Sequence, residues 1–306
     1  MTGIQAPARP QHIARGVILI IATGFVISSQ DVVFKLFSSE LSLWQIFAVR
    51  AVLAFPLLIA LAWRQGAALA GALKPWPLFR ALGMTLTFMA FYAALPFLSL
   101  STVGAANYVA PIFVTLLSAY VISEPAGARG WIAVFVGFAG VVILLQPGTD
   151  AFSPWAILPV AGAFFYALAH IATRTKCQGV PVITMALSVN FMMLIAGVAM
   201  SGVVMLWQPD AELVHAYPNV LRRWSVIDPS GWAVLTVLAV LSVAIGMMLA
   251  GAYQVAPPSV IATFEYSYLV FVAIWDFTVF GITPTGMAVL GMLMIVGAGL
   301  LTLQRE

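Results

Sequence analysis

The chain has 306 residues, of which 63% are hydrophobic and only 8% are charged, and its mean hydropathy is +1.07. A typical soluble domain is about 25% charged, and a soluble fold of this length would leave too much apolar surface in water. The net charge of +3 does not indicate nucleic-acid binding, because the basic residues are scattered through short loops and form no patch. The composition therefore predicts an integral membrane protein.

The N-terminal segment, residues 1–16, is basic and precedes an apolar run, as in a secretory signal peptide. The run continues past about 20 residues without a small-residue cleavage site, so we interpret it as a retained first membrane span. The single cysteine, Cys177, excludes an intrachain disulfide and a multi-cysteine metal site. We expect no metal and no cofactor.

Ten apolar runs reach the length of about 20 residues that a helix needs to cross a bilayer. In chain order they cover residues 14–37, 43–63, 79–98, 103–122, 129–146, 154–174, 181–207, 232–253, 259–280 and 284–303. The longest connection between them is residues 208–230. The sequence thus predicts an all-α integral membrane protein with ten transmembrane helices.

The distribution of lysine and arginine predicts how these helices are oriented. With the N-terminus in the cytoplasm, the cytoplasmic segments hold Arg9, Arg15, Arg64, Lys74, Arg80, Arg129, Arg174, Lys176 and Arg305. Only Lys35, Arg222 and Arg223 fall on the external side. Because positive residues concentrate in cytoplasmic loops, we expect both termini in the cytoplasm of a bacterial cell, with the protein in the inner membrane.

The two halves of the chain resemble each other. Residues 22–37 align with residues 161–176, and residues 104–122 align in the same order with residues 261–279. Each half, residues 1–149 and residues 150–306 with the external loop 208–230, then holds five spans. An odd number inserts the second half upside down. This pattern predicts two inverted five-helix repeats around a central cavity, an architecture that permits transport by alternating access.

The sequence also resembles the EamA-type branch of the drug/metabolite transporter superfamily. The residues that carry the resemblance are the first span ending in Lys35, Arg50 in the run LWQIFAVRAVLA, and the run from Tyr92 to Gly148, which contains Pro111 and Glu124. The second half is looser, since Tyr268 stands where Pro111 would repeat and Gly281 where Glu124 would. Within the branch, the chain is most similar to bacterial aromatic amino acid exporters of the YddG type.

This resemblance implies export of aromatic or other neutral amino acids and related metabolites. The superfamily also contains importers and carriers of other metabolites. Import or exchange of S-adenosylmethionine or a nucleoside is therefore an open alternative.

Polar residues in the first span are candidates for substrate binding. Gly24, Ser28, Asp31 and Lys35 are spaced to form one stripe, which should face protein or a water-filled cavity. Gln30 lies beside Asp31. We expect Asp31, Lys35 and Arg50 to form a charged cluster near the external end of the cavity, with a purely structural ion pair as the alternative.

The fourth span offers a second polar face. Pro111 has no amide hydrogen, so it leaves a backbone carbonyl free in mid-membrane, where the carbonyl can accept a hydrogen bond from a substrate ammonium. Asn107 and Tyr108 add neutral donors and acceptors next to it. The alternative is a proline kink that serves packing alone. Tyr92, in the third span, is a candidate wall of the cavity.

In the second half, Tyr166, His170 and Arg174 share a helix face. His170 either titrates near neutral pH or donates one structural hydrogen bond. Arg174 and Glu124 are interpreted as structural or gating charges. Glu265, the deepest carboxylate of this half, is expected to bind a substrate ammonium or to carry a coupling proton.

Rival functions have weaker support in the sequence. It contains no glycine-rich phosphate loop, no H-E-x-x-H motif and no nucleophile elbow, so we do not expect an enzyme. Scattered single ionisable groups also fit a channel poorly, because channels favour repeated pore-lining rings. The expected partners are a small-molecule substrate and the lipid bilayer, with no nucleic acid. The expected state is a monomer, with a dimer as the alternative.

Overall fold

The computed structural model describes residues 12–37, 41–94, 97–98, 100–124, 126–146 and 153–303. Within these ranges the chain is helical, with short turns and no β-strand. Nine helical segments of the described chain are long and apolar enough to cross a membrane. The prediction of an all-α, multi-pass membrane protein is therefore confirmed.

Eight long helices are continuous: α1 (Ile13–Phe37), α2 (Leu43–Arg64), α3 (Pro75–Ala94), α6 (Gly127–Leu145), α7 (Ile157–Lys176), α8 (Val182–Trp207), α11 (Pro229–Val255) and α14 (Gly286–Leu303). The predicted fourth and ninth spans are each interrupted, and give α4 (Leu100–Asn107) with α5 (Ala110–Val121) and α12 (Pro258–Glu265) with α13 (Ser267–Phe280). Short helical turns connect them: η1 (Leu69–Leu73), η3 (Pro154–Ala156), α9 (Ala211–Ala216) and α10 (Pro218–Leu221). The tenth predicted span corresponds to α14, whose apolar stretch Gly286–Thr302 is shorter than the other nine.

The third span begins earlier than the sequence predicts. We expected residues 79–98, whereas α3 covers Pro75–Ala94. Pro75 and Pro77 suggest a loop, but proline is tolerated in the first turn of a helix, where the amide hydrogens have no partner within the helix. The earlier start places Arg80 inside the helix and not at its boundary.

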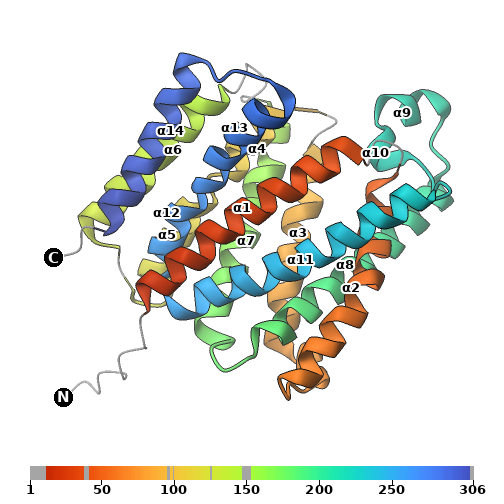
Figure 1. Cartoon of the computed structure of the whole chain (residues 1–306), viewed down its shortest axis with the longest axis horizontal. Helices are drawn as coiled ribbons and strands as arrows, with labels where there is room; N and C mark the ends of the chain where they lie inside the picture. The colour runs from red at the N-terminus through yellow and green to blue at the C-terminus, as the bar shows by residue number, and fades with distance from the viewer. Residues whose placement is uncertain are drawn as a thin grey trace.

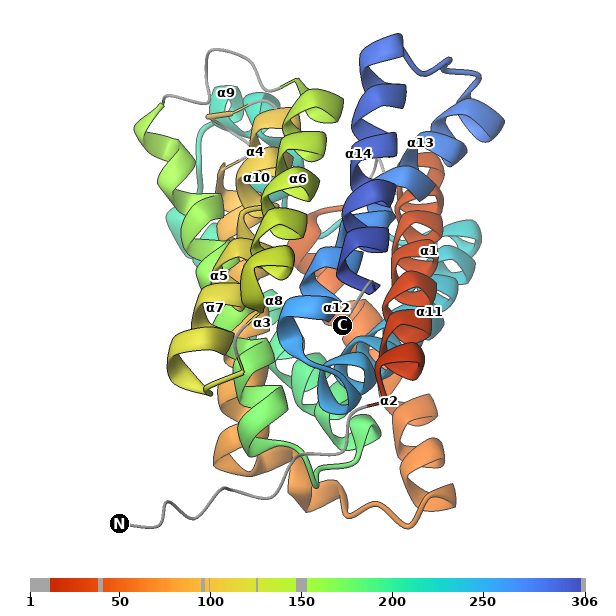
Figure 2. The same cartoon turned by 90° about the vertical axis from the view of Figure 1, so that its left-hand side faces the viewer.

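The long helices pack in pairs (Figures 1 and 2). At one side of the bundle α6 lies along α14, and at the other α2 lies along α8. Between these pairs, α1 packs on α11, and α3 packs on α7. The interrupted spans fill the middle, where α12 packs against both α5 and α1. The predicted boundary between the two halves, at residues 149 and 150, lies outside the described residues.

Small residues allow the closest of these contacts. A Cβ atom added at Gly140 on α6 would lie 2.8 Å from the carbonyl oxygen of Gly291 on α14. The reverse distance, from a Cβ atom at Gly291 to the carbonyl oxygen of Gly140, is 2.6 Å. Glycine therefore lets these two backbones touch, as expected for helices packed in a membrane. Gly297, on the same helix, has no neighbouring atom within 4 Å of such a Cβ, so it serves no close contact.

The connection 208–230 is folded and tied to the start of α2. The side chain of Gln45 donates to the carbonyl oxygen of Ser225 at 2.7 Å and accepts from the amide of Ser225 at 3.0 Å. The indole of Trp44 donates to the carbonyl oxygen of Val220 at 2.8 Å. Three hydrogen bonds thus hold this loop against α2.

The outer surface of the bundle is apolar, as a lipid-facing surface must be. Large aliphatic side chains are strongly exposed there, including Ile18 (67%), Leu206 (85%) and Leu293 (64%). Such a surface is unfavourable in water but matches the hydrocarbon of a bilayer. The polar side chains discussed below lie between the helices.

Candidate functional site

The fourth and ninth spans are interrupted at residues that lie next to each other. The regular helix stops after Asn107 and resumes at Ala110, and it stops again after Glu265 and resumes at Ser267. The phenol of Tyr266 donates to the carbonyl oxygen of Tyr108 at 3.4 Å, and the two ring centroids are 6.0 Å apart. Interrupted helices that meet in the membrane interior are a common way to form a transporter site.

Glu265, the last residue of α12, is the acidic group at this point. Its Oε1 atom accepts a hydrogen bond from Tyr166 of α7 at 2.6 Å and from Tyr253 of α11 at 2.8 Å. The residue is partly exposed, and no described lysine, arginine or histidine forms an ion pair with it. Glu265 is therefore a carboxylate held by neutral donors.

Behind the two tyrosines lies His170, which is completely buried. Its ring centroid is 3.9 Å from that of Tyr253 and 4.2 Å from that of Tyr166. Neither ring nitrogen has a hydrogen-bond partner in the described chain. The two phenol rings cover the imidazole, so His170 does not reach the surface in this conformation.

Arg80 of α3 is a further polar side chain near His170 and Tyr166, and together with Glu265 and Tyr253 these residues are called the polar layer. Arg80 is not among the candidates that the sequence predicts. The residue is 1% exposed, and its Nε atom donates to Thr173 of α7 at 2.8 Å. We had assigned Arg80 to a boundary, and only the early start of α3 brings it inside the bundle. Tyr253 was also missed, because a lone tyrosine near the end of an apolar run gives no signal for a distant carboxylate.

Asp31 is the second acidic group near the interruptions. Its Oδ2 atom accepts a hydrogen bond from Tyr268 of α13 at 2.6 Å, and its side chain is exposed. One turn earlier on α1, Ser28 accepts from the indole of Trp275 at 3.1 Å. The predicted polar stripe of the first span therefore faces protein, as expected, and its neighbour is α13.

The predicted cluster of Asp31, Lys35 and Arg50 does not form as expected. Arg50 makes no ion pair with Asp31, and its guanidinium carbon lies 5.8 Å from the ring centroid of Phe47. The side chain of Lys35 lies outside the described residues. Of the predicted cluster, only the contact between Asp31 and Arg50 can therefore be judged, and the two side chains do not form an ion pair.

The remaining candidate binding residues surround the same region. Tyr108 lies within electrostatic range of both Asp31 and Glu265, and its ring centroid is 6.2 Å from that of Tyr268. Tyr92 makes edge contacts with Phe47 at 5.8 Å and with Phe91 at 5.4 Å. Gln30 and Asn107 each bury a side-chain oxygen that has no hydrogen-bond partner among the described residues. Such oxygens can accept hydrogen bonds from a substrate.

The interruption of the fourth span has the predicted proline. Pro111 is buried in the first turn of α5, and its own carbonyl oxygen accepts from Thr115 at 2.8 Å. Because proline lacks an amide hydrogen, the carbonyl oxygen of Asn107, four residues earlier, receives no helical hydrogen bond from position 111. That carbonyl lies beside the tyrosines described above.

Glu124 and Arg174 form an ion pair at the end of the bundle where α1 begins, called here the N-terminal end. Nη2 of Arg174 lies 3.2 Å from Oε1 of Glu124, and its Nη1 atom donates to the carbonyl oxygen of Gln254 at 2.9 Å. Arg174 is fully buried. This contact joins the ends of α5, α7 and α11.

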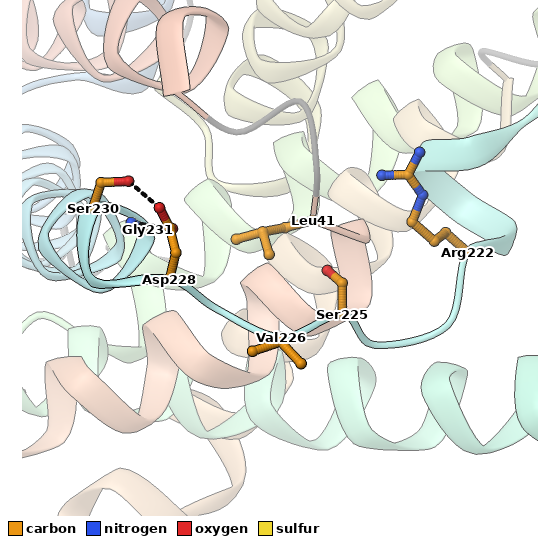
Figure 3. Close-up of a pocket in the computed structure, with 7 residues that line it drawn as sticks. All are labelled: Leu41, Arg222, Ser225, Val226, Asp228, Ser230 and Gly231. Atoms are coloured by element: carbon orange, nitrogen blue, oxygen red, sulfur yellow. Dashed lines mark hydrogen bonds between the residues drawn. The ribbon is translucent and has the colours of Figure 1, made fainter.

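A pocket of about 590 Å³ lies at the opposite end of the bundle. Figure 3 shows Leu41 before α2 and Arg222, Ser225, Val226, Asp228, Ser230 and Gly231 of the loop and of the start of α11 around it. The carboxylate of Asp228 accepts from the Ser230 hydroxyl and, at 2.8 Å, from the amide of Gly231. This pocket is distinct from the central cavity that the sequence predicts.

Comparison with known proteins supports a transporter. The model of the EamA-like transporter family matches residues 14–146. The chain is 30% identical to a riboflavin transporter of Vibrio cholerae over 186 residues, 61% of this chain and 56% of the relative. It is 22% identical to an S-adenosylmethionine uptake transporter of Rickettsia prowazekii over 208 residues, 67% of this chain and 64% of the relative. These two matches thus span less than two thirds of each relative.

Two further similarities cover nearly the whole chain. The pseudopaline exporter CntI of Pseudomonas aeruginosa is 22% identical over 287 residues, 92% of this chain and 94% of the exporter. A solved crystal structure with 17% sequence identity aligns with a TM-score of 0.76 over 96% of this chain and 100% of its own. At this sequence identity, the similarity to the solved structure shows the fold alone. The matching family model and the relatives named here are all of transporters, which is consistent with our expectation that the chain is not an enzyme.

Proposed function

We propose that this protein is an EamA-type secondary transporter with ten membrane spans. Residues 1–149 and 150–306 form two inverted repeats, and small metabolites cross between them by alternating access. The protein lies in the bacterial inner membrane as a monomer, with both termini in the cytoplasm. The observation that carries the proposal is the pair of carboxylates, Asp31 and Glu265, held by tyrosines beside two interrupted helices.

The packing of the helices supports inverted repeats. If each half contributes five spans in order, α1 corresponds to α7 and α3 corresponds to α11. The contact between α1 and α11 then has its counterpart in the contact between α7 and α3, and both pairs are extensive. The second helix of each half, α2 and α8, and the fifth, α6 and α14, contact each other. Such contacts between equivalent helices are expected where a pseudo-two-fold axis in the membrane plane relates the two halves.

The chemistry of the site favours a substrate with a cationic group. Two carboxylates that form no ion pair with any described side chain attract an ammonium, and tyrosine rings interact favourably with cations and with aromatic groups. Asp31 is the more exposed of the two carboxylates, and we assign to it the binding of the cationic group of the substrate. Export of aromatic or other neutral amino acids fits these requirements.

S-adenosylmethionine is the second candidate substrate. The similar protein of Rickettsia prowazekii is named as a transporter of that compound. Its sulfonium and ammonium groups also suit a site with two carboxylates.

A counterflow screen with purified protein in liposomes tests the proposal. Vesicles are loaded with one compound, and uptake of the labelled compound is measured for amino acids, S-adenosylmethionine, nucleosides and riboflavin. We expect saturable exchange of a compound with a cationic group, reduced at least about tenfold by Asp31→Asn because a charge-assisted contact is worth about 1.5–3 kcal/mol. Asp210→Asn, a carboxylate in the external loop, is the matched control. Ohmic conductance, or no exchange of any compound, would contradict the proposal.

A further inference from the structure

Glu265 connects three helices through one oxygen atom. It ends α12, and its Oε1 atom accepts hydrogen bonds from Tyr166 of α7 and from Tyr253 of α11. Both donors are phenols, which supply hydrogen bonds without charge. The negative charge of this carboxylate is thus balanced by no cation of the described chain. A carboxylate with these surroundings inside a membrane indicates a functional role.

No other ionisable side chain near Glu265 neutralises it. His170 of α7 is separated from it by the two phenol rings, and Arg80 of α3 lies within electrostatic range of Tyr166 and His170. Tyr108 and Tyr266 lie on its other side. The helices that pack against α12 carry, in addition, Arg15, Asp31 and Lys35 on α1, Tyr120 on α5, Arg129 on α6, Arg174 and Lys176 on α7, and Tyr268 and Asp276 on α13. Within the described chain, Glu265 forms no hydrogen bond or ion pair with any of them.

The same tyrosines belong to helices that meet at the N-terminal end of the bundle. Tyr253 immediately precedes Gln254, whose carbonyl oxygen accepts from Arg174. Tyr166 lies two turns before Arg174 on α7. The hydrogen bonds of Glu265 are therefore made by the two helices whose ends Arg174 joins to Glu124. A change at Glu265 acts directly on the helices that close this end.

We propose that Glu265 binds and releases the proton that is exchanged for substrate. In one step the carboxylate takes up a proton from one side of the membrane and becomes a carboxylic acid. After access changes, a substrate with a cationic group binds near Asp31, and the acid releases the same proton to the other side. Substrate and proton compete because a cation bound near Asp31 disfavours protonation of Glu265, and Tyr108 lies within electrostatic range of both carboxylates.

The hydrogen bonds explain how this exchange moves the protein. The anionic form of Glu265 accepts strong hydrogen bonds from both phenols, whereas the neutral acid accepts weaker ones. Proton binding therefore loosens α12 from α7 and α11, and proton release tightens the three helices again. The inference rests on the proposed function, because it assigns a driving ion to the same transport site.

A liposome experiment tests proton coupling separately from transport. Vesicles contain a pH-sensitive dye, and the substrate is whichever of phenylalanine, S-adenosylmethionine and riboflavin gives the largest counterflow. We expect one proton to move against each substrate molecule. Glu265→Gln should lower the number of protons moved per substrate molecule at least tenfold, and Glu265→Asp, which keeps a carboxyl group, should retain this ratio.

His170→Gln is the matched control, since His170 is the other titratable group of this layer, and it should leave the proton signal unchanged. Net movement of substrate down its gradient by the wild-type protein without any proton movement would overturn the inference and leave the proposed function intact. Loss of the proton signal in His170→Gln but not in Glu265→Gln would overturn it too. Absence of counterflow for all three compounds would overturn both proposals. If Glu265→Gln does not fold, the ratio of protons to substrate molecules in the wild-type protein tests the inference, and a ratio near zero would overturn it.

Discussion

Tyr266 donates a hydrogen bond at 3.4 Å to the carbonyl oxygen of Tyr108, a residue 158 positions earlier in the chain. Each tyrosine lies where a membrane span is interrupted, so this contact joins the two interruptions. A neighbour from a third helix fixes the position of Tyr266. A Cβ atom at Gly137 of α6 would lie only 2.5 Å from the tyrosine ring.

Gly137→Ala should therefore displace Tyr266 from its partner. Overpacking of a well-packed core costs about 1–3 kcal/mol, and we expect a loss of this size in stability, seen as a lower melting temperature in detergent. Transport should fall as well, since Tyr266 adjoins Glu265. Gly297→Ala on α14 is the control, because a Cβ atom there meets no atom within 4 Å. Equal stability of the two variants would contradict this account of the site.

The ion pair of Glu124 and Arg174 should keep the N-terminal end closed. Cys177 follows α7 at this end, is fully buried, and is the only cysteine of the chain, so it reports opening without further engineering. Hydrogen bonds to charged groups contribute about 1.5–3 kcal/mol, and Arg174→Gln should therefore raise the labelling rate of Cys177 by maleimide about tenfold or more.

Glu124→Gln should have the same effect on Cys177. Lys74→Gln, which removes a positive charge at the same end, should have little effect. Unchanged labelling in both Arg174→Gln and Glu124→Gln would show that the ion pair does not limit access.

The paired hydrogen bonds of Gln45 and Ser225 should hold the external loop in place. Gln45→Leu removes both bonds and leaves two backbone groups of the loop without partners. We expect a loss of about 1–3 kcal/mol and faster cleavage within residues 208–228 in limited proteolysis. Asn219→Ala changes an exposed side chain of the same loop and serves as the control. A digestion pattern like that of the wild type would argue against this role.

Asp228 should make the start of α11 sensitive to acid. The carboxylate caps this helix, and hydrogen bonds from the Ser230 hydroxyl and from the amide of Gly231 hold the pKa of Asp228 below its ordinary value of 3.8. A carboxyl group whose pKa is lower in the folded protein stabilises the fold at pH values above the pKa that it has in the unfolded chain. This contribution is lost as the pH falls through the lower, folded-state pKa. Asp228→Ala should thus be less stable than the wild type at pH 7.

The difference between Asp228→Ala and the wild type should shrink as the pH falls below 3.8. Thermal unfolding in detergent at several pH values measures it. A difference that is constant with pH would mean that the charge of Asp228 does not contribute.

The sequence by itself determined the medium, the class of fold and most of the helices. A bilayer requires about 20 apolar residues per span, and this requirement is local, so the ends of α1, α2 and α8 agree with the predicted runs within about two residues. The polar stripe of Gly24, Ser28 and Asp31 was also readable, because a helix places such residues on one face. The candidates Asp31, Tyr108, Tyr166 and Glu265 were identified in this way.

Only the tertiary structure decided which of these residues meet. Tyr166 is 99 positions from Glu265, and Arg174 is 50 positions from Glu124. Apolar spans pack through similar Leu, Val and Ala surfaces, so their sequences do not specify how far each helix is rotated about its axis. Packing of these helices left Arg50 without an ion pair to Asp31 and buried Arg80 against Thr173.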